Sequence, residues 1–168
     1  MKAVWVLIEV ALALALQTTL ARHLPGGAAA LDLVLVVVVY VALTSGPVAG
    51  IFAGSLGGMF QDALSSGVIG IGGIAKSVVG FAAGAIGQQF IVTAAFPRLV
   101  IFLVSTAAHA TVFMGLYVLL GLRSFPSPWG AILGQALGNA AVGMIVFTIV
   151  ESVPRVVKRG GLFKRARH

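Results

Sequence analysis

The sequence contains no cysteine and very few charged residues. The absence of cysteine excludes a disulfide scaffold, a metal site built on thiolates and a cysteine nucleophile. Only 9% of the 168 residues are charged and four are acidic, whereas about a quarter of an average soluble domain is charged. Hydrophobic residues make up 60% of the chain, and the mean hydropathy is +1.11. We therefore expect a membrane protein whose function lies in or beside the bilayer.

Motifs of catalysis and of cofactor binding are also lacking. No glycine-rich phosphate-binding element opens a helix after a strand, and the acidic residues and histidines lack the spacing of a metal site. Ser55 and His109 are the residue types of an intramembrane serine protease, but residues 53–57 lack the Gly-x-Ser-Gly form of the rhomboid family. We expect no enzymatic activity, no cofactor and no metal.

Apolar runs separated by glycine, proline or charge predict an all-α bundle of six membrane helices, since a spanning helix needs about 20 apolar residues. These runs fall at about 3–21, 31–44, 48–64, 72–93, 99–121 and 130–151. The β-branched run 33–41 would suit a strand in water, but an open strand cannot satisfy its backbone in lipid. The second and third runs are short and share a break at 44–47, so one kinked or re-entrant element, with five spans in all, is an alternative. The first run could also be mistaken for a signal peptide, but its length favours a span.

The distribution of lysine and arginine predicts that both termini are cytoplasmic, because short cytoplasmic loops are rich in these residues. Only Arg22 and Arg123 then lie outside, and Lys76 falls within a span. Eight of the eleven basic residues lie inside: Lys2, Arg98, Arg155, Lys158, Arg159, Lys164, Arg165 and Arg167. The chain thus reads as one transmembrane domain, 1–154, followed by a basic cytoplasmic tail, 155–168.

The tail holds six of the basic residues behind the net charge of +7. We expect it to orient the last span and to contact anionic lipids, each basic residue near the surface contributing about 1 kcal/mol. An acidic cytoplasmic partner is the alternative. Nucleic acid is disfavoured, because no aromatic or groove-reading element accompanies the charge.

Two predicted spans carry glycine at every fourth position, which places the glycines on one face of each helix. Such bare faces let helix backbones approach closely in lipid. We expect them either to pack helices of this chain together or to receive a membrane helix of another protein. The two sets are Gly46, Gly50, Gly54 and Gly58, and Gly130, Gly134 and Gly138.

Polar residues inside the predicted spans need partners, because they are costly in hydrocarbon. Asp62 and Lys76 carry opposite charges at similar depth, and we expect them to form or adjoin a buried polar cluster beneath the outer loop 65–73. An alternative is that each charge reaches the membrane interface by itself. His109 and Asn139 fall near the midplane, where we expect a mutual hydrogen bond. Glu9 must face protein, be protonated or lie near the headgroups.

Residues 31–84 carry three short motifs. An Asp followed by an apolar helix ending in Tyr, 32–40, precedes the first glycine set. The segments Gln61-Asp-Ala-Leu-Ser-Ser-Gly-Val-Ile-Gly70 and Ile74-Ala-Lys-Ser77 follow. The order and spacing of these motifs resemble MreD, a small multi-spanning protein family of bacterial shape determination. Leu31 departs from the pattern, since many members have proline before the Asp.

The resemblance implies a non-catalytic scaffold subunit of the cell-elongation complex in the inner membrane, which maintains cell shape by organising peptidoglycan synthesis. It implies binding to MreC, and a place beside MreB, RodA and a penicillin-binding transpeptidase. The family's fold is similar to the substrate-binding components of energy-coupling-factor transporters, so a carrier of a vitamin-like molecule is the alternative. The candidate site residues that match the family pattern are Asp32, Gln61, Asp62, Ser65, Gly70 and Lys76.

Overall fold

The computed structural model describes residues 2–20, 31–65, 67–90 and 94–165, and within these ranges it describes side-chain surroundings from residue 4 to residue 152. This part of the chain is all-helical, as the sequence predicts. Its six helices are α1 (Lys2–Leu20), α2 (Leu33–Ser45), α3 (Pro47–Leu64), α4 (Ile71–Gln89), α5 (Ala95–Leu119) and α6 (Trp129–Arg165).

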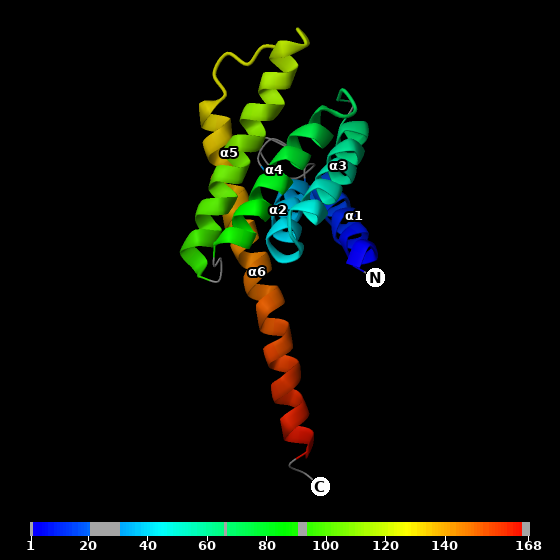
Figure 1. Ribbon diagram of the computed structural model, residues 1–168, viewed down its shortest axis with the longest axis vertical. Coiled ribbons are helices and arrows are strands. Elements are labelled where there is room, and N and C mark those ends of the chain that lie inside the picture. The colour runs from blue at the N-terminus through cyan, green and yellow to red at the C-terminus, as the bar shows by residue number, and fades with distance from the viewer. Residues whose placement is uncertain (1, 21–30, 66, 91–93, 166–168) are drawn as a thin grey trace.

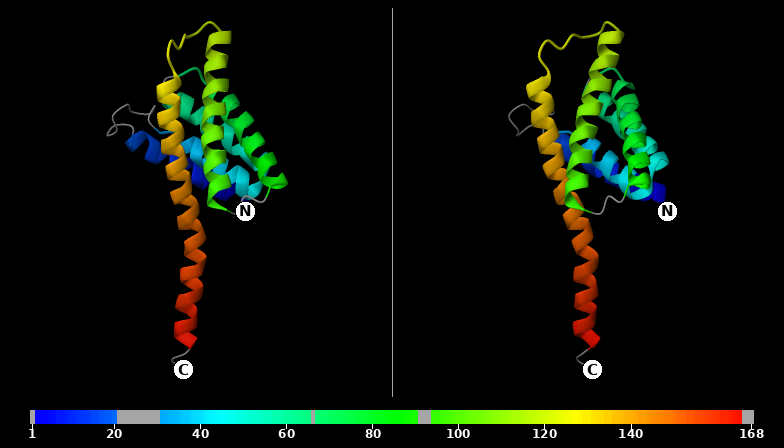
Figure 2. Two further views of the ribbon diagram at one scale, coloured as in Figure 1. Left: turned by 90° about the vertical axis from the view of Figure 1, so that its left-hand side faces the viewer. Right: turned by 60° about the vertical axis from the view of Figure 1, so that its left-hand side comes forward.

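The helices form a bundle in which α5 and α6 run as a long pair beside the group α1–α4 (Figure 1). Helix α2 is central to this arrangement, since it packs against α3, α4, α1, α6 and α5. Both views in Figure 2 show α1 beginning at the lower side of the bundle, the side from which the end of α6 projects.

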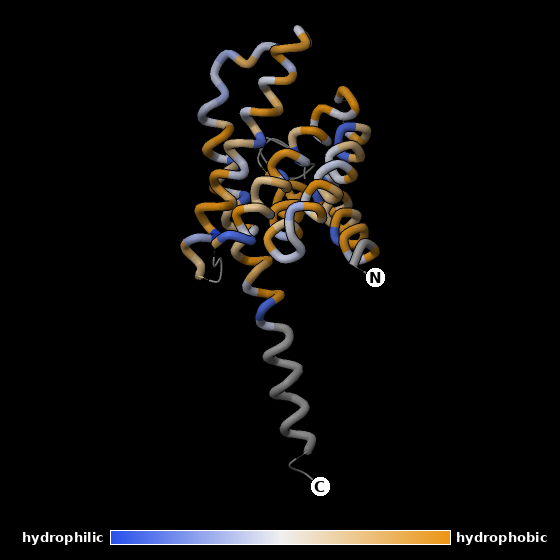
Figure 3. The backbone as a smooth tube through the Cα atoms, in the orientation of Figure 1, coloured by the Kyte–Doolittle hydropathy of each residue, from blue (hydrophilic) through white to orange (hydrophobic). Residues whose placement is uncertain are grey.

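Among the described residues, three helices are long and apolar enough to cross a membrane: α4, α5 and residues Trp129–Ser152 of α6. Shorter apolar helices cover Val4–Leu20 and Leu33–Ser45, and hydrophobic positions dominate throughout the bundle (Figure 3). With 13 residues, α2 is about 20 Å long, which is short of the roughly 30 Å hydrocarbon core. The run predicted at 31–44 is therefore too short to cross by itself.

The break predicted between the second and third runs separates two helices. Gly46 has φ +92°, a conformation that glycine adopts without steric cost, and Pro47 follows at the first position of α3. Proline suits that position because its missing N–H has no partner in a helix start. Because α2 and α3 then pack against each other, they are two helices and not one kinked helix. The re-entrant form of the alternative stays a prediction.

The first glycine set joins α3 to α4. A Cβ atom at Gly50 would overlap the backbone of Gly80, and one at Gly54 would overlap the backbone of Lys76. A Cβ atom at Gly58 would overlap the backbone of α4 near its start. The backbones therefore touch along this seam, which confirms packing within the chain for this face.

The second glycine set is different. A Cβ at Gly130 or Gly134 would meet nothing within 4 Å, and both residues are exposed, whereas Gly138 is partly buried. Within the described residues, this face of α6 therefore packs no other helix at Gly130 and Gly134. The interpretation of packing within the chain is wrong for these two positions.

Burial explains why the β-branched run of α2 is helical. Branching at Cβ lowers helix propensity, yet eight residues of α2 are buried. Four of them, Leu35, Val36, Val39 and Ala42, pack with Phe102 and Phe147 in the core between α2, α4, α5 and α6. The other four, Leu33, Val34, Val38 and Val41, pack in a second core with residues of α1 and α3. Tertiary packing thus determines the helix here.

Helix α6 differs from its prediction at the C-terminal end. It continues to Arg165, well past the expected end of the span near 151. The basic segment is therefore continuous with the last helix over most of its length, rather than a separate tail.

Candidate functional site

The start of α2 lies inside the bundle and is built around Asp32. This residue is 3% exposed and is the N-cap of α2. Its Oδ1 accepts a hydrogen bond of 2.9 Å from the backbone N–H of Leu35. A carboxylate in this position satisfies one of the N–H groups that every helix start leaves unpaired.

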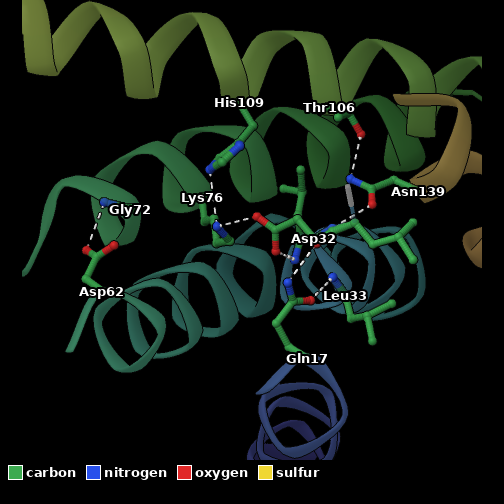
Figure 4. A network of polar contacts seen from close by, with 11 residues as sticks. Gln17, Asp32, Leu33, Asp62, Gly72, Lys76, Thr106, His109 and Asn139 are labelled. Atoms are coloured by element: carbon green, nitrogen blue, oxygen red, sulfur yellow. Dashed lines mark hydrogen bonds and ion pairs between the residues drawn. The ribbon is translucent and has the colours of Figure 1, made fainter. Parts of the chain in front are cut away.

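The second Asp32 oxygen forms a buried ion pair with Lys76 of α4. Lys76 Nζ lies 2.7 Å from Asp32 Oδ2, and the two side chains are 3% and 5% exposed. Lys76 Nζ also lies 3.2 Å from Nε2 of His109 on α5. Because an ammonium group only donates, His109 Nε2 is the acceptor and the imidazole proton is on Nδ1. The three side chains form the Asp32–Lys76–His109 cluster (Figure 4).

Asn139 of α6 extends this cluster to the last helix. Its Oδ1 accepts from the backbone N–H of Asp32 at 2.9 Å, and its Nδ2 donates to Thr106 Oγ1 at 3.2 Å. Asn139 is fully buried. One amide side chain thus links the start of α2 to both α5 and α6.

Gln17 of α1 also bonds to the backbone at the start of α2. Its Oε1 accepts from the N–H of Leu33, and its Nε2 donates to the carbonyl oxygen of Leu31, each at 2.7 Å. The side chain replaces the main-chain partners that a continuous helix would supply. Contacts from α1, α4 and α6 therefore converge on the residues at the start of α2, and His109 and Thr106 of α5 bond to Lys76 and Asn139 behind them (Figure 4).

This convergence lies near the middle of the apolar part of α6. Asn139 follows Trp129 by ten residues, or about 15 Å along a segment of 24 residues that is about 36 Å long. Irregular backbone at such depth is tolerated only where protein buries it or where it lines a cavity. In transporters, helix starts at the midplane receive the substrate or ion.

A second polar group lies at the N-terminal end of α4. Asp62 Oδ2 accepts from the N–H groups of Gly70 and Gly72, both at 2.9 Å. A Cβ at Gly72 would overlap the Asp62 carboxylate, so glycine is required there. Asp62 caps α4 from the end of the preceding helix.

Lys76 lies in a buried polar cluster, as expected, but the acidic member of that cluster is Asp32 and not Asp62. The glycine backbone at the start of α4 already occupies the Asp62 carboxylate. The mutual hydrogen bond expected between His109 and Asn139 is wrong, since these residues lie in one buried region but bond to Lys76 and Thr106 respectively. Equal depth in the membrane does not determine which helix faces lie opposite each other.

The remaining candidates have identifiable places. Ser65 ends α3, where its N–H donates to the carbonyl oxygens of Gln61 and Asp62. Gly70 precedes α4 with φ +108°. Gln61 has a buried side-chain oxygen without a hydrogen-bond partner among the described residues. These residues thus belong to the α3–α4 connection, apart from the Asp32–Lys76–His109 cluster.

The serine and histidine considered as a protease pair are not paired. Ser55 Oγ and Ser77 Oγ lie 2.7 Å apart, while the His109 ring contacts Lys76. Among the described residues, no three His, Asp or Glu side chains are grouped so as to hold a metal ion.

Sequence analysis did not identify Gln17, Thr106 or the pair of Arg98 and Glu151. Arg98 Nη2 bonds to Glu151 Oε1, and its guanidinium lies 4.4 Å from the Phe147 ring centroid. A polar residue within an apolar run is the signal that would have indicated Gln17, by the rule that applies to His109 and Asn139.

Comparisons with models of protein families, with curated proteins and with solved structures find no match for this chain. The function is therefore argued from the geometry of the site and from the sequence resemblance.

Proposed function

We propose that this protein is a non-catalytic membrane scaffold subunit of MreD type. In this role it binds the membrane helix of MreC in the bacterial inner membrane and helps to organise peptidoglycan synthesis. MreB, RodA and a penicillin-binding transpeptidase are its wider partners. All six helices contribute to a multi-pass bundle, and the basic residues that follow the last span contact anionic lipid.

The observation that supports a scaffold is that side chains of this chain already occupy the polar groups at the start of α2, near the middle of the apolar part of the bundle. The Asp32 carboxylate occupies the position that a substrate anion would take at the start of α2, and Lys76 neutralises its charge. At the start of α2, Gln17 accepts a hydrogen bond from the N–H of Leu33, and Asn139 accepts one from the N–H of Asp32. Since these groups are satisfied internally, the arrangement supports a rigid interior better than a binding pocket.

The exposed glycine face of α6 supports a partner helix. Gly50 and Gly54 pack against the backbone of α4, whereas Gly130 and Gly134 face open space. Small residues let helices approach closely in lipid, where apolar burial provides little driving force. We assign the MreC helix to this face of α6.

Co-purification with MreC tests the assignment. Gly134→Leu is expected to reduce recovery of MreC without changing the thermal stability of the chain, because the added side chain meets no atom of its own bundle. Gly115→Leu is the matched control, since Gly115 is also exposed and has nothing within 4 Å of an added Cβ. Equal recovery of MreC with both variants would refute the α6 face, and no recovery with the unaltered chain would refute the scaffold.

A carrier component for a small molecule is the second candidate. It is favoured by the interruption before α2 and by His109 Nδ1, which is buried without a hydrogen-bond partner among the described residues. Recovery of a transporter ATPase module in the same pull-down, together with a ligand-dependent thermal shift, would support this candidate against the scaffold.

A further inference from the structure

The surface of the α3–α4 pair carries a groove of about 360 Å³ that the scaffold proposal does not use. Met59 of α3 and Ile74 and Val78 of α4 form its rims. Gly70, Gly73, Ser55 and Ser77 form the rest of the lining. The groove follows α4 for eight residues, or about 12 Å at 1.5 Å per residue.

The floor of the groove is bare because α3 and α4 meet through small residues. A Cβ at Gly73 would lie 2.9 Å from Met59 Cγ and 3.3 Å from the carbonyl oxygen of Ser55. A residue larger than glycine at position 73 would therefore displace Met59 or the backbone of α3. The recess is a fixed consequence of the glycine seam.

The two serine hydroxyl groups in the lining are already hydrogen-bonded within the protein and need no polar ligand. Ser77 Oγ donates to the carbonyl oxygen of Gly73 at 2.7 Å. Ser55 Oγ lies 2.7 Å from Ser77 Oγ, and its proton satisfies that bond. The chemistry of the lining therefore fits an apolar occupant, and water gains too few hydrogen bonds to be held there.

The position of the groove indicates where the occupant comes from. Helix α4 is one of the three helices able to cross the membrane, and the rim side chains of Met59, Ile74 and Val78 are 47%, 55% and 50% exposed. These side chains point away from the bundle, so the groove opens toward the hydrocarbon that surrounds a membrane helix. The molecules present at that surface are lipids.

We propose that this groove binds one acyl chain of a membrane lipid as a site of defined position. The chain lies along α4 from Gly70 to Val78, on the backbone floor between the rims. Its volume lies at the lower end of the range of about 300–1,000 Å³ for ligand pockets. The preformed floor lowers the ordering cost of binding, which distinguishes this lipid from those that merely surround the bundle.

The test compares lipid retention among variants of the full chain purified in mild detergent. Val78→Trp and Ile74→Trp place a large side chain at the groove, whereas Leu133→Trp adds one at a lipid-exposed position of α6 that is 65% exposed. Native mass spectrometry of each protein after addition of phosphatidylethanolamine measures the bound fraction. Displacing about two methylene groups from apolar contact weakens binding about tenfold.

The expected result is one phospholipid retained by the unaltered chain and by Leu133→Trp, and about tenfold weaker retention by both groove variants. Equal retention by all four proteins would overturn the proposal, as would retention by none. A loss of MreC recovery in the groove variants, with phospholipid retention unchanged, would assign the groove to a partner helix and would also overturn it. Far-UV circular dichroism melting of the same samples separates loss of the site from unfolding. If both groove variants melt early, Val78→Phe and Ile74→Phe replace them; weaker retention then supports the proposal and unchanged retention overturns it.

Discussion

Removing one member of the Asp32–Lys76 pair is expected to destabilise the protein far more than removing both charges. Lys76→Met leaves the Asp32 carboxylate 3% exposed and without its cation. Breaking a buried ion pair in this way costs about 3–5 kcal/mol, because the remaining charge stays desolvated. Asp32→Asn is expected to cost a similar amount, since it leaves the Lys76 ammonium beside a neutral imidazole.

The double variant Asp32→Asn/Lys76→Met removes both charges and keeps an oxygen that can accept from the Leu35 N–H. We expect it to be more stable than either single variant, with a coupling free energy of about 2–3 kcal/mol. The assay is a double-mutant cycle of unfolding in mixed micelles, followed by circular dichroism as dodecyl sulfate is added. Each of the four proteins must unfold reversibly for the cycle to be evaluated.

Asp62 provides the matched control for this cycle. Its carboxylate caps α4 through Gly70 and Gly72 and does not touch Lys76. The costs of Asp62→Asn and Lys76→Met are therefore expected to add within about 0.5 kcal/mol. Additive costs for Asp32 and Lys76, or strong coupling between Asp62 and Lys76, would refute the assignment of the ion pair.

Three further predictions concern the packing and the hydrogen bonds around this site. Gly50→Leu is expected to unfold the α3–α4 seam and lower the melting temperature, because its Cβ would overlap Gly80; Gly134→Leu is the neutral comparison, and similar melting of the two would contradict the packing argument. Gln17→Leu leaves two buried main-chain groups unpaired and is expected to cost about 2–4 kcal/mol, measured as faster hydrogen exchange at the start of α2; unchanged exchange there would contradict it. Asp62→Ala removes two hydrogen bonds to the start of α4 and is expected to cost about 1–2 kcal/mol, with exchange at α2 unaffected.

Much of the helical architecture could be predicted because membrane helices are encoded locally. A long apolar run predicts a helix wherever lipid excludes unpaired backbone, and the helices α3 and α4 begin within a residue of their expected positions. The break at Gly46 and Pro47 was also apparent, since both residues act through their own backbone geometry. The end of α6 was not predicted correctly. The helix runs to Arg165, because basic residues do not by themselves end a helix.

The charged members of the candidate site could be predicted, but neither their pairing nor the parts of Gln17 and Thr106. Asp62 and Lys76 stand out as charges in an apolar chain, and Asp32 was named through the resemblance to MreD. Depth along a helix, however, says nothing about which way a side chain faces. The partner of Lys76 depends on how α2 and α4 rotate about their axes. That rotation follows from the glycine contacts between α3 and α4 and from the burial of α2.

The sequence by itself therefore determined the membrane setting, the helical class and the residues that need partners, because composition and short-range pattern govern all three. Only the tertiary structure decided that α2 begins inside the bundle, that Asp32 and Lys76 neutralise each other, and that one glycine face is consumed while the other stays open. The physical reason is that buried polar groups and bare helix faces are satisfied by whatever lies opposite them. In this protein the opposing group comes from a different helix.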